Sequence, residues 1–388
     1  MPSKGLYIHI PFCVKKCNYC AFLSFNADDK TKQDYVKALI NEIKLKSVGR
    51  PSVETIYIGG GTPSVLKVSQ MRDILQTVFE CLDVKPDPEI TIEVNPGTLG
   101  SSDEKIYNKL KAYREMGFNR LSMGVQSTDN NRLHFLGRIH SAEEVERDVR
   151  LAGKAGFDNI NLDLIFSVPG ESKADALLDA RQLIKLKPEH ISCYSLQMEE
   201  GTPFYEMADN GDIIEVSDEE DRETYHDICR LLKGAGYEHY EISNFAKPGF
   251  RSRHNSLYWD MSEYIGCGIG AAGFEGGVRY KNVSDIEEYL RAYSDEDSLS
   301  NKPLFDEENV NTPFDNISEA VFTGLRRKEG ISYKELCKSE QEFWTVFADA
   351  RQEAEKFAES GHLIIDRRGL RLTEKGIDIS NQIMSLFV

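Results

Sequence analysis

Residues 6–20 read LYIHIPFCVKKCNYC, a strand-like run followed by three closely spaced cysteines, Cys13, Cys17 and Cys20. The β-branched and aromatic residues of the run predict a strand over 6–10. The spacing C-x3-C-x2-C places three thiols on one short loop, where their thiolates can bind three irons of a four-iron cluster and leave the fourth iron open. This stretch therefore predicts an iron–sulfur site directly after the first strand.

Two other uses of these cysteines stay open from the residues alone. A structural zinc site is normally tetrahedral, and His9 could supply the fourth ligand. Disulfides are less favoured, because three thiols at such short spacing cannot all pair. The remaining cysteines are scattered along the chain and are expected to be buried or free thiols: Cys81, Cys193, Cys229, Cys267 and Cys337.

Length and composition allow a large core and two domains, since the chain has 388 residues and 40% of them are hydrophobic. No apolar run is long enough to predict a membrane span, and the first five residues leave no room for a signal peptide, so a cytoplasmic protein is expected. Acidic residues number 64 against 47 basic ones, for a net charge of −17. Because nucleic-acid-binding proteins carry a concentrated basic surface, no nucleic-acid partner is expected.

Strand-like runs alternate with helix-like segments over residues 1–283. The expected strands are 6–10, 55–58, 89–94, 120–124, 159–166 and 190–196. One expected helix has its apolar residues on a single face: Met71, Ile74, Leu75, Val78 and Leu82. This alternation predicts an α/β fold with a parallel sheet of six or more strands, wound into an open or closed barrel whose site lies at the carboxyl ends of the strands.

Local signals mark several helix ends. Capping boxes at Ser101–Glu104 and Ser141–Glu144 are expected to begin two helices. Glycine followed by an aromatic residue is expected to end three helices, because glycine adopts the left-handed turn that stops a helix. These pairs are Gly117-Phe118, Gly156-Phe157 and Gly236-Tyr237.

The composition changes after residue 283. Residues 284–311 are rich in Asp, Glu, Ser and Asn and are expected to form a solvated acidic connector. Residues 312–388 contain helical runs and then two strand-like segments on either side of Arg367-Arg368-Gly369. They predict a small, winged-helix-like α+β domain at the carboxyl end of the chain.

Four motifs together carry a resemblance to a known family. They are residues 7–20, GGGTP at 59–63, EVNP at 93–96 and SMGVQS at 122–127. In these, and over nearly its whole length, the chain resembles the coproporphyrinogen-oxidase-like branch of the radical S-adenosylmethionine (SAM) enzymes. The resemblance implies a partial (β/α)6-type barrel with a 4Fe-4S cluster on Cys13, Cys17 and Cys20. It also implies SAM on the open iron, cleaved by one electron to a 5′-deoxyadenosyl radical.

The resemblance further implies which residues contact SAM. Gly60, Gly61 and Thr62 follow the second strand, and residues without a Cβ let a ligand approach the backbone amides. Without the resemblance, the glycines would be read as a tight turn. The other positions that match SAM contacts in the family are Tyr7, Glu93, Gln126, Arg138 and Asp163.

Two features separate the sub-branches of this family. Porphyrinogen dehydrogenases resemble the pattern C-x3-C-x2-C-x-C, but here the fourth cysteine position is Phe22. The motif H-N-x-x-Y-W, which marks haem chaperones of the HemW type, is present at 254–259. An imidazole is a good axial ligand of haem iron, and flat aromatic rings stack on a porphyrin. His254, Tyr258 and Trp259 are therefore expected to bind haem.

The function expected from the resemblance is that of a haem chaperone. Such a protein binds haem as cargo and transfers it to haem-requiring respiratory or membrane proteins. The 4Fe-4S cluster and SAM would support dimerisation or a redox step, which implies an electron donor and makes a homodimer one option. No catalytic residue is assigned. The alternatives are an oxygen-independent coproporphyrinogen III dehydrogenase and a radical SAM enzyme with an unrelated small substrate.

Overall fold

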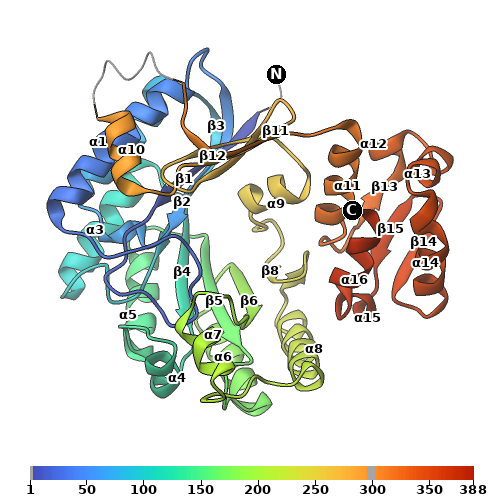
Figure 1. The fold of residues 1–388 in the computed structure, drawn as a ribbon. Coiled ribbons are helices and arrows are strands. Elements are labelled where there is room, and N and C mark those ends of the chain that lie inside the picture. The colour runs from blue at the N-terminus through green and yellow to red at the C-terminus, as the bar shows by residue number, and fades with distance from the viewer. Residues whose placement is uncertain (1–2, 295–301) are drawn as a thin grey trace.

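A computed structural model describes residues 3–294 and 302–388 (Figure 1). Its largest element is a twelve-stranded sheet with the order β12-β11-β10-β9-β1-β2-β3-β4-β5-β6-β8-β7. Six neighbouring strands are parallel and follow the order of the sequence: β1 (Lys4–Ile10), β2 (Ser52–Gly60), β3 (Asp83–Val94), β4 (Arg120–Gln126), β5 (Ile160–Phe166) and β6 (His190–Ser195). The predicted six-stranded α/β architecture is confirmed.

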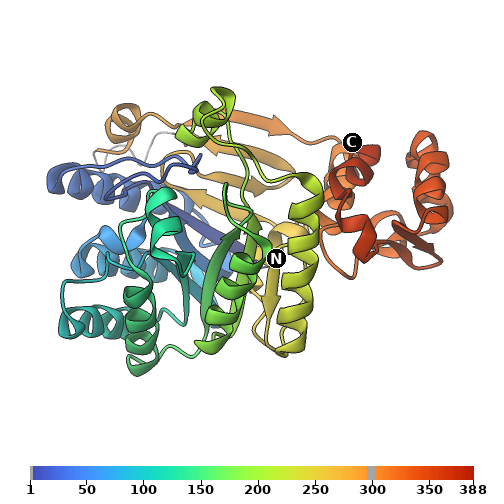
Figure 2. The same cartoon turned by 90° about the horizontal axis from the view of Figure 1, so that it is seen from below.

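Helices connect the parallel strands and cover the outer face of the curved sheet (Figures 1 and 2). They are α1 (Asp29–Lys46), α2 (Val68–Cys81), α3 (Asp103–Met116), α4 (Asn130–Phe135), α5 (Ala142–Lys154) and α6 (Lys173–Lys185), with a 3₁₀ turn at Pro63–Val65. Five described helices follow β6 up to residue 324, namely α7 (Pro203–Asp209), α8 (Asp218–Gly234), α9 (Arg253–Trp259), α10 (Ile286–Tyr293) and, past β12, α11 (Pro313–Gly324). The helices pack against apolar side chains of the strands, and helices and strands together form one hydrophobic core.

Short strands extend the sheet at both edges. At one edge, β9 (Tyr264–Cys267) pairs with β1 in parallel, and an antiparallel meander continues through β10 (Ala272–Glu275), β11 (Val278–Asn282) and β12 (Phe305–Val310). At the other edge, β8 (Asn244–Ala246) and β7 (Glu238–His239) pair antiparallel beyond β6. The edge strands β12 and β7 do not pair with each other in the described residues, so the sheet is open.

The predicted helix ends agree with the structure except at one position. Gly117, Gly156 and Gly236 have φ values of 110°, 97° and 90°. The aromatic residues after them are buried, as expected: Phe118, Phe157 and Tyr237. Glu144 accepts from the amide of Ser141 at 3.1 Å, but α3 is capped by Ser102 instead of Ser101. Oγ of Ser102 accepts from the amide of Lys105. The helix therefore begins one residue later than the predicted capping box.

The structure corrects the prediction of an acidic connector over 284–311. Helix α10 packs on α1 with Tyr289 fully buried, and β12 pairs with β11. The acidic residues of β12 are exposed on an edge strand, where charge discourages pairing with other chains. Residues 295–301 of the predicted connector lie outside the described residues.

The carboxyl-terminal domain is α+β, as predicted. Its three-stranded sheet has the order β13-β15-β14. Its elements after α11 are β13 (Ile331–Ser332), α12 (Tyr333–Cys337), α13 (Glu340–Val346), α14 (Ala348–Glu359), β14 (Leu363–Asp366), β15 (Gly369–Leu372), α15 (Glu374–Ile377), α16 (Ser380–Met384) and a 3₁₀ turn at Ser385–Phe387. Among the described helices, none combines the length and apolar character needed to cross a membrane.

Candidate functional site

A cavity of about 530 Å³ lies inside the curve of the sheet, between the loop after β1 and the amino end of β4. Its size is typical of small-molecule sites. Alternate residues of each strand face inward, so on β4 the cavity is lined by Arg120, Ser122 and Gly124. The residues that alternate with them along β4 are buried in the hydrophobic core: Leu121, Met123 and Val125. The strand therefore presents polar side chains and glycine to the cavity and apolar side chains to the core, as a ligand site on a sheet requires.

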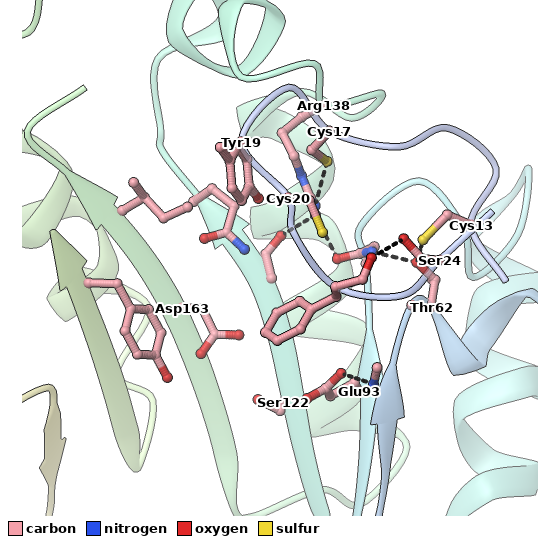
Figure 3. A pocket seen from close by; sticks show the side chains of 18 of the residues that line it. Cys13, Cys17, Tyr19, Cys20, Ser24, Thr62, Glu93, Ser122, Arg138 and Asp163 are labelled. Atoms are coloured by element: carbon pink, nitrogen blue, oxygen red, sulfur yellow. Dashed lines mark hydrogen bonds between the residues drawn. The ribbon is translucent and has the colours of Figure 1, made fainter. Parts of the chain in front are cut away.

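Cys13, Cys17 and Cys20 all line this cavity on the loop between β1 and α1 (Figure 3). The three cysteines are half-buried and free of disulfides. Backbone hydrogen bonds fix the loop, because the amide of Cys13 donates to the carbonyl of Phe25 at 2.9 Å and the amide of Cys20 donates to the carbonyl of Cys17 at 3.3 Å. The structure thus brings the three predicted cluster ligands to one end of the cavity.

The donor set fits a cluster better than a single metal ion. Within residues 3–294 and 302–388, no three His, Cys, Asp or Glu side chains converge closely enough to hold one ion. Cluster thiolates bind different irons and therefore stand farther apart than the ligands of one ion. The zinc alternative also lacks its fourth ligand, because both ring nitrogens of His9 are engaged, with the Tyr7 hydroxyl and the Leu23 carbonyl, each at 2.9 Å.

A series of polar contacts connects Cys13 with Cys17. Thr62 Oγ1 lies 3.5 Å from Sγ of Cys13 and accepts from Nδ2 of Asn95 at 2.8 Å. Arg138 donates from Nη2 to Oδ1 of Asn95 at 2.6 Å and from Nη1 to Sγ of Cys17 at 3.5 Å. The guanidinium therefore supplies a positive charge beside a residue expected to bind iron as a thiolate. Thr62 and Arg138, both predicted to contact SAM, lie next to the cluster ligands.

The glycine run after β2 holds that strand end against the cysteine loop. A Cβ on Gly60 would lie 2.3 Å from the ring of His9, and φ at this residue is 107°. Gly61 donates its amide to the carbonyl of Ile10 at 2.8 Å, and a Cβ there would lie 2.8 Å from the same oxygen. Close packing of protein thus already requires these glycines. Both also line the cavity, and their contact with SAM stays a prediction.

Two carboxylates, Glu93 and Asp163, line the cavity farther from the cysteine loop (Figure 3). Glu93 accepts from the hydroxyl of Tyr57 at 2.5 Å and from the amide of Gly60 at 2.9 Å. Asp163 accepts from Nδ2 of Asn161 at 2.8 Å. Burial raises the pKa of Glu93 from 4.5 to about 7, and burial also raises the pKa of Asp163. Both carboxylates are positioned to accept from an amine or hydroxyl of a ligand.

The raised pKa of Glu93 predicts a pH-dependent stability of the cluster-free protein. A carboxyl with a higher pKa in the folded state takes up a proton on folding, so its contribution is present below about pH 4.5 and is lost as the pH rises through about 7. Relative to Glu93→Gln, the wild type should lose stability from pH 5 to pH 7.5, by at most about 3 kcal/mol. Water in the cavity will reduce this value. Urea unfolding at each pH measures it, with the exposed Glu80→Gln as control. A wild-type-minus-variant difference that stays constant with pH would contradict the assignment.

Gln126 ends β4 with an unusual backbone and also lines the cavity. Its φ is 71°, a region that favours glycine, and the register with β5 shifts between Gly124 and Gln126. Its Oε1 is buried without a hydrogen-bond partner in the described part of the chain. A bulged strand end that presents an unused acceptor fits the predicted contact with a ligand.

Tyr7 does not line the cavity as it is described here. Its hydroxyl contacts Nδ1 of His9, and its ring lies 6.2 Å from the ring of Tyr57. In this structure Tyr7 packs beside these two residues. The geometry gives no support to its predicted contact with SAM.

The motif at 254–259 forms most of helix α9, which packs against the amino ends of β2 and β3. His254 is 1% exposed, and its ring nitrogens contact Thr55 Oγ1 at 2.7 Å and the Tyr258 hydroxyl at 2.8 Å. Burial lowers the pKa of His254 to about 3, so the ring is neutral. The motif residues are brought together, but both nitrogens that could bind iron are engaged within the protein.

Two other residues of the motif face in different directions. Asn255 lines the cavity. Trp259 packs against the carboxyl-terminal part of the chain, with the guanidinium of Arg326 4.5 Å from its ring. Helix α9 therefore connects the floor of the cavity to the second domain.

The cavity residues that were not identified from the sequence include Asn95, Arg120 and Asn255. Asn95 and Asn255 lie inside motifs that the sequence does reveal, EVNP and HNxxYW, and could have been included on that ground. Arg120 has period-two spacing with Ser122 and Gly124, which is the signal that could have placed it on the inner row.

Comparisons with known proteins agree with this geometry. Residues 7–183 match the model of the radical SAM superfamily, and residues 311–379 match the HemN C-terminal domain. A protein named heme chaperone HemW from Lactococcus lactis is 36% identical over 98% of this chain and 96% of its own length. The protein of the same name from Bacillus subtilis is 33% identical over 99% of both chains.

A solved structure shares the fold. The coproporphyrinogen III oxidase HemN of Escherichia coli, a radical SAM enzyme, superimposes with a TM-score of 0.83 over 99% of this chain and 90% of its own, at 23% identity. The superfamily implies a 4Fe-4S cluster and SAM, and the cysteine loop and the cavity of this chain fit both. From its full-length relatives, the chain belongs to the HemW family of radical SAM proteins.

Proposed function

We propose that this protein is a haem chaperone, which binds haem and transfers it to haem-requiring proteins. It carries a 4Fe-4S cluster on Cys13, Cys17 and Cys20, with SAM in the adjoining cavity. The observation that carries the proposal is similarity over the full length to proteins named heme chaperone HemW, including the motif at 254–259. The electron donor, the haem-accepting respiratory or membrane proteins and a homodimeric state belong to the same proposal.

The position of Phe22 favours a chaperone over the alternative, a coproporphyrinogen III dehydrogenase. Porphyrinogen dehydrogenases resemble a pattern with a fourth cysteine at this position. Here the phenylalanine is 68% exposed and lines the cavity. An exposed aromatic ring at the entrance cannot serve as a sulfur ligand, but it can contact the flat face of a porphyrin.

Parallel assays of anaerobically reconstituted protein test the proposal. With haemin, we expect a stable complex with a Soret band. With coproporphyrinogen III, SAM and a reductant, we expect no decarboxylated product. Both assays use the full chain, with a coproporphyrinogen III oxidase as the positive control for turnover. Product formation at a comparable rate, or no haemin complex, would contradict the chaperone proposal.

The contribution of the motif to haem binding is part of this proposal. Axial ligation by His254 would require its contact with Thr55 or Tyr258 to break, since these two residues occupy both ring nitrogens. Tyr258 and Trp259 lie on the same helix, α9, and would contribute to haem binding from there. Glu89 holds the amino end of this helix, because it accepts from the amide of His254 at 2.9 Å.

A further inference from the structure

Arg120 is a buried cation that the described residues leave without a hydrogen-bond or ion-pair partner. Its side chain is among the largest that are fully buried, with 1% exposure, and it lines the cavity. In residues 3–294 and 302–388, no hydrogen bond or ion pair reaches its guanidinium, and its Nε is buried without an acceptor. A guanidinium stays charged in proteins and presents five donors. Arg120 therefore needs an anion or water that the folded chain does not itself provide.

The other arginine of the cavity shows the contrast. Arg138 donates from its two Nη atoms to Asn95, to the Gly124 carbonyl and to Cys17, and only its Nε lacks an acceptor in the described residues. A buried charge that lacks such partners is destabilising, and a bound counter-ion offsets this cost. Both Nη atoms of Arg138 thus have partners within the protein, whereas the described residues offer the guanidinium of Arg120 none.

The nearby carboxylates do not fill this requirement. Arg120 is close enough to Glu93 and Asp163 to lower the pKa of each, although burial raises both pKa values overall. Neither carboxylate forms an ion pair with it within the described chain. Glu93 instead accepts from Tyr57 and Gly60, and Asp163 accepts from Asn161. An incoming anion would therefore not have to displace an existing salt bridge.

A second unused donor lies along the same cavity. Asn255 lines it, and its side-chain amide has no hydrogen-bond partner within residues 3–294 and 302–388, whereas its backbone amide donates to Oγ of Ser252. Asn255 belongs to α9, next to His254, whose pKa is lowered by burial and also by the positive charge of Arg120. Helix α9 and Arg120 are therefore neighbours at the floor of the cavity.

We propose that Arg120, together with Asn255, binds the carboxylate of a ligand in this cavity. The inference rests on the proposed function, under which two ligands carry carboxylates, namely haem through its propionates and SAM through its methionyl group. Arg120 lies four strand residues before Gly124, which corresponds to about 13 Å along β4. The carbonyl of Gly124 contacts Arg138 at the cysteine loop. Apolar residues also line the cavity, among them Ile165 and Leu196. This separation from the cysteine loop favours the propionate of an extended apolar ligand.

Affinity measurements on reconstituted full-length protein test the site. Arg120→Gln should weaken binding of the carboxylate ligand by about 10- to 100-fold, as expected for loss of charge-assisted hydrogen bonds. Arg120→Lys should recover part of this loss. Haemin and SAM are titrated separately into each variant, so that the two sources of the carboxylate are distinguished. Arg150→Gln, which changes an exposed arginine paired with Asp103, is the matched control and should bind as the wild type does.

Haemin dimethyl ester provides a second test, in which the ligand's carboxylates are removed instead of the arginine. If Arg120 binds a propionate, the wild type should bind the ester about as weakly as Arg120→Gln binds haemin. Arg120→Gln should then bind haemin and the ester with the same affinity. If the carboxylate belongs to SAM, Arg120→Gln should weaken SAM alone, and wild type should bind haemin and its ester equally. Unchanged affinity for both ligands in a folded Arg120→Gln protein, or equal binding of ester and acid by the wild type together with unchanged SAM affinity in Arg120→Gln, would overturn the proposal. Failure of the wild type to bind haemin would count against the chaperone function, and the SAM titration would still decide the role of Arg120.

Discussion

Replacing Cys17 with alanine is expected to abolish the iron–sulfur cluster. Two thiolates on this loop would remain, and a three-cysteine cluster has no spare protein ligand with which to replace the third. Iron and sulfide should fall from about four of each per chain to near zero, and the visible absorption should disappear. The change also removes the sulfur contacted by Nη1 of Arg138.

Metal and sulfide analysis after anaerobic reconstitution measures this effect. Cys81→Ala is the matched control, because Cys81 is also a half-buried free thiol but lies at the end of α2. It should keep the full cluster. Full iron and sulfide in Cys17→Ala would remove the residue from the ligand set.

The second large effect is expected at Glu42, a carboxylate with no exposed surface that joins α1 to the strands beyond β1. It pairs with Lys46 at 2.9 Å and accepts from Tyr289 at 2.6 Å. It also accepts from the amide of Gly268 and from Nδ2 of Asn282, each at 2.7 Å. Lys46 is only 5% exposed, so removal of its partner leaves an uncompensated buried charge.

Glu42→Ala should therefore lower the free energy of unfolding by about 3–5 kcal/mol. Urea unfolding of the cluster-free protein measures this loss. Glu80→Ala on the exposed face of α2 is the control and should change the value by less than about 0.5 kcal/mol. A loss below about 1 kcal/mol in Glu42→Ala would show that water replaces the carboxylate at little cost.

The parts of the fold that were predicted correctly depend on local patterns. Strand β1, the cysteine loop and the alternation of strands and helices follow from spacing within a few residues of each other. The helix ends at Gly117, Gly156 and Gly236 follow from the backbone freedom of glycine. Such signals need no knowledge of distant contacts, so the sequence was sufficient for them.

The strands at the edge of the sheet required non-local information. Strand β9 has four residues and pairs in parallel with β1, which lies about 260 positions earlier in the chain. Strand β12 carries an acidic run whose side chains are exposed, and it resembled a connector because its backbone pairing with β11 leaves no mark in the side-chain pattern.

The site residues also divide into those predicted from local sequence patterns and those that depend on distant contacts. The three cysteines were found from spacing, and the structure brings them together with Thr62 and Arg138. The hydrogen bond between His254 and Tyr258 joins positions i and i+4 of a helix, so it could have been anticipated. The contact with Thr55 could not, because it joins segments 199 positions apart.

The claim on which this account depends is that a cluster at Cys13, Cys17 and Cys20 keeps one iron open toward the cavity. Electron paramagnetic resonance of the anaerobically reduced wild type, recorded with and without SAM, tests it most directly. The account predicts a 4Fe-4S signal whose shape changes when SAM is added. A signal that SAM leaves unchanged, or protein that contains zinc and no sulfide, would contradict it.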